Sequence, residues 1–193
     1  MIDFMVTVEE TYMPLTLFAP DLTNKGFEEL CEQYSDFRLE YTSEGEVIIM
    51  PPTDPDTGAR NSTLNYELRG WVASTKRGVV TDSSTGFHLR NGAQRSPDVA
   101  WVSSRERMRR KPTCPEFVIE LLSPSDRGKK VHEKMLEWIA NGAELGWMID
   151  PFRKTVSIYR SGHEPEVREG ITEIAGEGPV AGFVLDLCEI WDV

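Results

Sequence analysis

The order of apolar and polar residues divides the first part of the chain into helices and short strands. Apolar residues recur at helical spacing over residues 24–34, with Asn24 as a candidate cap, and again over residues 60–75. Between these helices, FRLEY and EVIIM flank the Gly-containing TSEG, which predicts a β-hairpin. The Pro- and Asp-rich PPTDPDTG predicts a loop. An N-terminal helix and hairpin are therefore expected before the second helix.

Residues 97–160 have the clearest pattern in the chain. PDVAWV, FVIELL and LGWMID are compact apolar runs, which are typical of strands buried on both faces. A helix is predicted from about 129 to 141, with Met135 and Trp138 on its inner stripe. TVSIYR alternates in the manner of an edge strand. We therefore predict one α/β domain over residues 1–193, with a mixed central β-sheet flanked by helices.

Charge is unevenly distributed along the chain. The 193 residues include 21 Lys and Arg and 32 Asp and Glu, for a net charge of −11, which disfavours nucleic acid and anionic lipid as partners. Residues 57–134 nevertheless carry a net charge of +7. This block contains an Arg-rich run that reads equally well as a solvated loop or a phosphate-binding stretch. Its members are Arg105, Arg107, Arg109, Arg110 and Lys111.

Several protein classes are excluded by absent motifs. The three cysteines, Cys31, Cys114 and Cys188, lie far apart and form no CxxC, which excludes a zinc ribbon or thioredoxin motif. The chain has no P-loop, dinucleotide fingerprint, HExxH or GxSxG. We see neither a signal peptide nor an apolar run long enough to span a membrane. Together with unpaired cysteines, this predicts a cytoplasmic protein without a membrane partner.

Two carboxylates stand where core strands are predicted. Glu120 lies inside FVIELL, and Asp98 begins the apolar DVAWV. A charge buried in such a strand is costly unless it is paired or binds a metal. On neighbouring strands the two carboxylates would converge on one hard cation such as Mg²⁺, which prefers oxygen ligands. The structural alternative is that Asp98 caps a turn and Glu120 pairs with an arginine.

A lysine follows these carboxylates on the predicted helix. Lys134 is three residues after Val131 and four before Trp138, so it borders the inner stripe, and its long stem can reach the sheet edge. Taken alone, it reads more simply as an exposed lysine paired with Glu133 or Glu137. Two carboxylates and a lysine around a cation are nevertheless suited to phosphodiester hydrolysis.

The chain resembles the Uma-two family, a group of restriction-endonuclease-like bacterial proteins in the PD-(D/E)XK nuclease superfamily. The resemblance runs from about Phe37 to the C-terminus. It rests on RLEY…GEVIIM, SPDVAWVS, PEFVIELLSPSDRGKKVHEKMLEWIANGAELGWMIDP and VSIYR. The most specific part is ELLSPS, followed by EK and then W-x-I-D-P. The resemblance implies a restriction-endonuclease-like core.

The resemblance also implies a set of site residues. Asp98 matches the Asp of the PD motif, and Glu120 matches the second acidic residue. The superfamily lysine is expected two residues after Glu120, where Leu122 stands, so Lys134 on the following helix takes its place. The backbone carbonyl of Leu121 is an expected extra metal ligand. Glu40 matches an acidic position that completes or supports the site.

Other family positions carry less information or depart from the pattern. Glu46, Ser123 and Ser125 match the family, but a solvated hairpin and a turn into the helix also explain them. Asn61 stands where family members commonly have a His, and Lys130 where they have an Asp. Because Asn61 cannot titrate, activity would be altered if that His transfers a proton.

We therefore predict an endonuclease that requires Mg²⁺ or Mn²⁺ and acts on nucleic acid, with DNA favoured. Asp98, Glu120 and Leu121 are the expected metal ligands, and Lys134 and Glu40 complete the predicted catalytic group. A homodimer would suit cleavage of both strands of a duplex. The alternatives are a catalytically silent nucleic-acid-binding or regulatory module and a structural protein-interaction domain. A carboxylate-pair glycosidase is disfavoured by the lysine and the family pattern.

Overall fold

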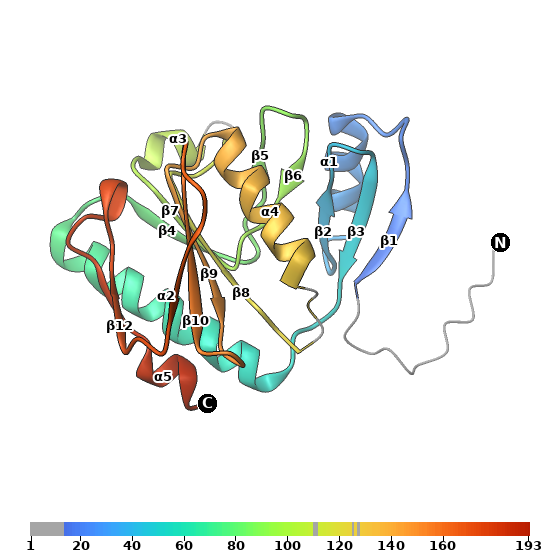
Figure 1. Cartoon of the computed structure of the whole chain (residues 1–193). Coiled ribbons are helices and arrows are strands. Elements are labelled where there is room, and N and C mark those ends of the chain that lie inside the picture. Colours follow the sequence, from blue (N-terminus) through green and yellow to red (C-terminus); the bar gives the residue numbers. More distant parts are fainter. Residues whose placement is uncertain (1–13, 110–111, 125, 127) are drawn as a thin grey trace.

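The structure is a computed structural model that describes residues 14–109, 112–124, 126 and 128–193 (Figure 1). Arg110, Lys111 and Ser125 lie outside the described residues. In chain order the elements are β1 (Leu15–Phe18), α1 (Asn24–Gln33), β2 (Arg38–Tyr41), β3 (Glu46–Met50), α2 (Pro55–Thr75), β4 (Val79–Asp82), β5 (Phe87–His88), β6 (Gln94–Arg95), β7 (Val99–Val102), α3 (Arg105–Arg109), β8 (Phe117–Leu121), α4 (Gly128–Asn141), β9 (Leu145–Asp150), β10 (Thr155–Arg160), β11 (Glu166–Glu169), β12 (Glu173–Ala175), the 3₁₀ turn η1 (Gly178–Val180), β13 (Val184–Asp186) and α5 (Cys188–Trp191).

The central sheet has the strand order β11-β10-β9-β8-β7-β4. Only β8 and β9 run parallel within it, joined by the crossover helix α4, and the other neighbours are antiparallel. The mixed central sheet predicted from the sequence is therefore confirmed. The prediction of β10 as an edge strand is wrong, because β11 pairs with it and four of its six residues are buried.

Helices cover both faces of this sheet, which explains the near-continuous apolar runs. Val99 and Trp101 pack with Leu64 and Leu68 of α2 on one face. On the other face, Ala100 packs in a second cluster with residues of α4, including Met135 and Trp138. Figure 1 shows α4 lying across the sheet, between it and the N-terminal strands. A strand between two helical layers needs apolar residues at every position.

A second sheet, with the order β1-β3-β2-β6-β5, carries the predicted hairpin and packs against α1. Its small cluster centres on Phe27 of α1, stacked on Tyr41 of β2 with ring centroids 5.4 Å apart. The cap of α1 is Thr23 rather than Asn24, because its side chain accepts a hydrogen bond from the Gly26 N–H.

Helix α2 begins earlier than the sequence pattern predicts. Asp54 caps it and Pro55 occupies its first turn, so half of the predicted Pro-rich loop is helical. Proline fits the first turn because the N–H it lacks would have no intrahelical partner there. The longer helix brings its N-terminal turn next to the hairpin (Figure 1).

No helix in the described ranges is long and apolar enough to cross a membrane. The three cysteines are all free thiols.

Candidate active site

A cleft of about 1150 Å³ separates the hairpin strands β2 and β3 from α4. The carboxyl end of β8, the segment before β7 and the first turns of α2 complete its lining. Among the described residues that line it, nine are acidic and five are basic. The cleft is therefore acidic, although nearly half of the residues that line it belong to the basic block.

Asp98 and Glu120 meet at one end of this cleft because of the register between β7 and β8. Val99 pairs with Ile119 in the antiparallel ladder, and one further step sets Asp98 opposite Glu120. Opposed residues of such a ladder point to the same face. The Leu121 N–H also donates to Asp98 Oδ2 at 2.8 Å, which ties Asp98 to the neighbouring strand. Glu120 lies within β8, as predicted, whereas Asp98 lies one residue before the neighbouring strand β7 rather than in it.

Lys134 reaches these carboxylates from α4. Its Nζ donates to Glu40 Oε1 at 2.8 Å and to the Ser96 carbonyl at 2.9 Å, and it lies 3.0 Å from Glu120 Oε1. Only 16% of its side chain is exposed. The simpler interpretation of an exposed lysine paired with Glu133 or Glu137 is therefore wrong, and the partner of Glu120 is a lysine rather than an arginine.

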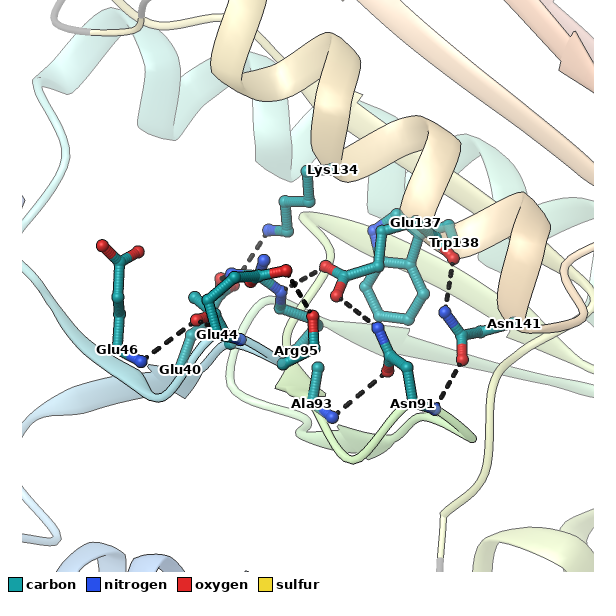
Figure 2. Close-up of polar contacts among 12 residues, drawn as sticks. Glu40, Glu44, Glu46, Asn91, Ala93, Arg95, Lys134, Glu137, Trp138 and Asn141 are labelled. Atoms are coloured by element: carbon teal, nitrogen blue, oxygen red, sulfur yellow. Dashed lines mark hydrogen bonds and ion pairs between the residues drawn. The ribbon is translucent and has the colours of Figure 1, made fainter. Parts of the chain in front are cut away.

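Glu40 links the hairpin to the central sheet. Its Oε1 accepts from the Ser96 N–H at 3.1 Å, and its Oε2 accepts from Arg95 at 3.2 Å. Arg95 also donates to Glu137 of α4 at 2.6 Å (Figure 2). Glu40, Arg95, Glu137 and Lys134 thus form one chain of alternating charges, referred to below as the ion-pair network. The network joins β2 and β6 to α4.

Trp138 also orients Glu120, from the side opposite Lys134. Its indole Nε1–H donates to Glu120 Oε1 at 2.8 Å. Glu120 is only 5% exposed, so its carboxylate orientation is set by Trp138 on one side and Lys134 on the other. Trp138 was predicted as a core residue from its helical spacing, and it also contributes this polar contact.

Burial and neighbouring charges set the protonation of the group. Burial and the nearby carboxylates of Asp98 and Glu40 raise the pKa of Glu120 to about 7, against the opposing charge of Lys134. Burial also raises the pKa of Asp98. Burial acts to raise the pKa of Glu40 as well, but Lys134 and Arg95 outweigh it and hold that pKa below its usual value. Burial would lower the pKa of Lys134, but Glu120 and Glu40 raise it, so Lys134 stays a cation.

The remaining residues singled out by sequence are distributed over the cleft and its rim. Leu121, Asn61, Lys130 and Glu46 all line the cleft, and Leu121 ends β8 beside Glu120. The Ser123 hydroxyl and N–H both donate to Asp126 Oδ2 at 2.7 Å, which stabilises the turn before α4. Of the described members of the Arg-rich run, Arg105, Arg107 and Arg109 form α3, and none of these three lines the cleft.

Sequence reasoning did not place Arg95 or the Ser96 carbonyl in the site, and it named Glu137 only as a surface partner of Lys134. Arg95 and Ser96 directly precede the PD pair, and Glu137 follows Lys134 by three residues on the same helix face. Proximity to the predicted site residues was therefore the one signal present. Their partners lie in segments distant along the chain, and a local pattern does not reveal such pairing.

The donor set at this end of the cleft fits a hard divalent cation. No group of three or more His, Cys, Asp and Glu in the described residues is arranged to hold a metal ion. Asp98 and Glu120 form a pair of carboxylates, with the backbone of Leu121 adjacent. Mg²⁺ commonly binds proteins through one or two carboxylates, with water and substrate phosphate as its other ligands. The two carboxylates are therefore enough, in number and in ligand type, to bind Mg²⁺.

Comparison with protein families identifies the class to which this fold and site belong. Residues 25–188 match the profile of Uma2, a family described as "Putative restriction endonuclease". The match covers most of the chain, so the protein belongs to the Uma2 family. The resemblance inferred from RLEY, SPDVAWVS and ELLSPS is thereby confirmed.

A solved structure with the same fold comes from Anabaena variabilis ATCC 29413. It is described as a "putative nuclease belonging to DUF820", is 22% identical in sequence, and aligns with a TM-score of 0.69. The alignment covers 79% of this chain and 89% of that one. A restriction-endonuclease-like α/β fold is thus confirmed. A search of curated proteins finds no significant match.

Proposed function

We propose that this protein is an endonuclease that uses Mg²⁺ or Mn²⁺ to hydrolyse phosphodiester bonds in nucleic acid, with DNA as the favoured substrate. The observation that carries the proposal is the contact of Lys134 with Glu120, which stands opposite Asp98 at the end of an open cleft. Family membership supports the nuclease class.

Asp98, Glu120 and the Leu121 carbonyl would hold the cation. When bound, the cation supplies Lewis-acid polarisation of the phosphate and a more acidic bound water. Two of these three ligands are oriented by protein hydrogen bonds. Asp98 accepts from the Leu121 N–H, and Glu120 accepts from the Trp138 indole. Such contacts reduce the reorganisation that ligand binding requires.

Lys134 would orient the attacking water and neutralise charge that develops on the phosphate. Its ammonium has three N–H donors, of which Glu40 and the Ser96 carbonyl accept two. Its contact with Glu120 is the one that changes if that carboxylate turns to a cation. Glu40 would act as a positioning residue, because its carboxylate anchors Lys134 to the hairpin and touches no reacting atom.

The acidic lining limits how nucleic acid binds. Nine carboxylates in the cleft repel phosphates, so binding is expected to be weak without a divalent cation and strongly dependent on salt. A homodimer would allow both strands of a duplex to be cut, since each copy offers one carboxylate pair.

A cleavage assay with plasmid and linear DNA, in the presence of Mg²⁺ or Mn²⁺, tests the proposal. Wild-type protein should cut, and Asp98→Asn and Glu120→Gln should each lower the rate by about 1,000-fold, because each removes a charged ligand. Glu133→Gln is the matched control, since Glu133 lies in the same cleft on an exposed face of α4. Its rate should equal that of the wild type.

Three outcomes would contradict the proposal. Equal cleavage by wild type, Asp98→Asn and Glu120→Gln would assign the activity to another site or a contaminant. Binding of DNA by a folded wild type without cleavage in either metal would instead identify a catalytically silent binding module. Binding of neither DNA nor metal would favour the structural interaction domain.

A further inference from the structure

The wall of the cleft formed by β2 and α2 carries polar atoms without partners. Among the described residues, Arg38 Nε and Asn61 Oδ1 are buried and make no hydrogen bond, and the buried Thr57 Oγ1 has the capping carboxylate of Asp54 beside it without a well-formed hydrogen bond. All three residues line the cleft, and Thr57 is only 4% exposed. A buried polar atom without a partner is costly, so two such atoms beside the Thr57 hydroxyl on one wall indicate a site that a ligand completes.

Local geometry brings the three residues to this wall. Arg38 and Glu40 are two apart on β2, so they share the strand face that looks into the cleft. Thr57 and Asn61 are four apart on α2 and share one helix face. The two faces meet at the cleft because α2 starts soon after β3 ends (Figure 1).

The wall is electrically coupled to the carboxylate pair. Burial raises the pKa of Asp98, while the charges of Lys134 and Arg38 act to lower it. Arg38 therefore lies within electrostatic range of Asp98. Lys134 and Arg95, in contrast, already pair with carboxylates of the ion-pair network.

The chemistry of the wall fits an anion with several acceptor oxygens. The guanidinium of Arg38 and the hydroxyl of Thr57 both donate, and arginine is well suited to phosphate. A metal ion would be repelled by the guanidinium. We propose that Arg38 and Thr57 form a phosphate-binding subsite that holds the substrate strand beside Asp98 and Glu120. Asn61 supplies an acceptor for an amino or ring N–H group of a neighbouring base. The inference rests on the proposed function, because it takes the ligand to be a nucleic-acid strand.

The subsite is tested by binding rather than by cleavage. The probe is a fluorescein-labelled single-stranded oligodeoxynucleotide in Ca²⁺, with fluorescence anisotropy as the readout and strand integrity checked afterwards. Arg38→Gln should weaken binding about 10-fold and reduce the salt slope by about 0.7, the value for one phosphate contact on a single strand. Arg69→Gln, an equal charge loss at an exposed position of α2, should bind within about twofold of wild type.

Thr57→Val separates a binding role from a structural one. Because the hydroxyl lies beside the Asp54 carboxylate without a well-formed hydrogen bond in the free protein, its removal should leave Tm within about 2 °C of the wild-type value. The same change should weaken oligonucleotide binding about 10-fold. Unchanged binding, or a larger fall in Tm, would overturn the role of Thr57 as a ligand-binding residue.

The remaining outcomes distinguish a free anion from a nucleic-acid strand as the ligand. They also separate failure of the subsite from failure of the nuclease proposal. Calorimetric titration with inorganic phosphate alone should give weaker binding that Arg38→Gln removes. If Arg38→Gln affects inorganic phosphate but not the oligonucleotide, the subsite serves a free anion and the proposal is overturned. If wild type does not cleave but its oligonucleotide binding depends on Arg38, the subsite stands and the nuclease proposal fails. If Arg38→Gln cleaves and binds as well as the wild type, the nuclease proposal stands and the subsite is overturned.

Discussion

The two sheets of this protein are stabilised by different forces. The central sheet is covered on both faces by helices and encloses two large apolar clusters. In the N-terminal sheet, β2 and β3 have one small cluster around Phe27 and Tyr41, and both strands also face the cleft; only β5 joins a large cluster, through Phe87. The edge strand β1 of this sheet is exposed along its whole length. Strands β2 and β6 contact α4 through the charged pairs of the ion-pair network, whereas β5 contacts it through Phe87 packed edge-on against Trp138.

This difference divides the tasks of the site between the two sheets. The central sheet sets the distance between Asp98 and Glu120 through a rigid ladder. The N-terminal sheet contributes Glu40 and Arg38, whose placement relative to α4 depends on ion pairs. We infer that the carboxylate pair is as stable as the fold, whereas the other wall of the cleft responds to charge and pH.

The largest expected effect is a difference in the free energy of unfolding that is lost when a buried phenylalanine of each region is replaced by alanine. Phe117 is fully buried and packs edge-on against Trp147, so Phe117→Ala should cost about 4 kcal/mol. Phe27→Ala should cost less, about 3 kcal/mol, since its partly buried neighbours can relax into the gap, and it should also slow cleavage by displacing β2. Urea unfolding and a cleavage assay measure both effects. Equal losses of stability would show that the two sheets do not differ in this way.

Glu40→Gln should give the next largest effect. Its loss leaves Lys134 and Arg95 with one carboxylate each and should cost about 2 kcal/mol. Displacement of Lys134 should slow cleavage about 100-fold while oligonucleotide binding changes little. Glu44→Gln, an exposed change in the same cleft, is the control. If Glu40→Gln cleaves as fast as this control, Glu40 has no role in the site.

A pH titration of the same variant refines the comparison. The pKa of Glu40 lies below its usual value in the folded protein, so its stabilising contribution is complete above the unfolded value of about 4.3. It is lost as the pH falls through the folded pKa. The stability difference between wild type and Glu40→Gln should therefore be constant near neutrality and shrink in acid. A difference that stays constant down to pH 3 would contradict this.

The smallest expected effect concerns the Arg-rich run. Arg105 and Arg109 lie on α3, and neither lines the cleft. The double change Arg105→Gln and Arg109→Gln should leave cleavage of a short oligonucleotide within about twofold of wild type, because surface charges away from the site act weakly. A large loss would place nucleic acid on α3 as well.

The sequence revealed the residues whose chemistry conflicts with their surroundings. Asp98 and Glu120 were found because charges rarely occur in apolar strands, and Lys134 because it borders an apolar stripe. Glu40 came from the family resemblance. Arg95 lies in a polar segment and Glu137 on an amphipathic helix, where charges are ordinary, so their pairing follows only from how the hairpin docks on α4.

Charge summed along the chain was a poor guide to the cleft. The block 57–134 is basic overall, yet acidic residues from the hairpin and α4 dominate the lining. Folding mixes segments that lie far apart in sequence, so local electrostatics depend on packing rather than on block totals.

Diffraction from crystals soaked in Mn²⁺ would locate the cation. An anomalous peak is expected about 2.0–2.3 Å from one oxygen each of Asp98 and Glu120, with Glu120 turned away from Lys134. The peak should vanish in Asp98→Asn crystals soaked in the same way. A Mn²⁺ peak elsewhere, or none while the Glu120–Lys134 ion pair stays intact, would contradict a metal-dependent nuclease at this site.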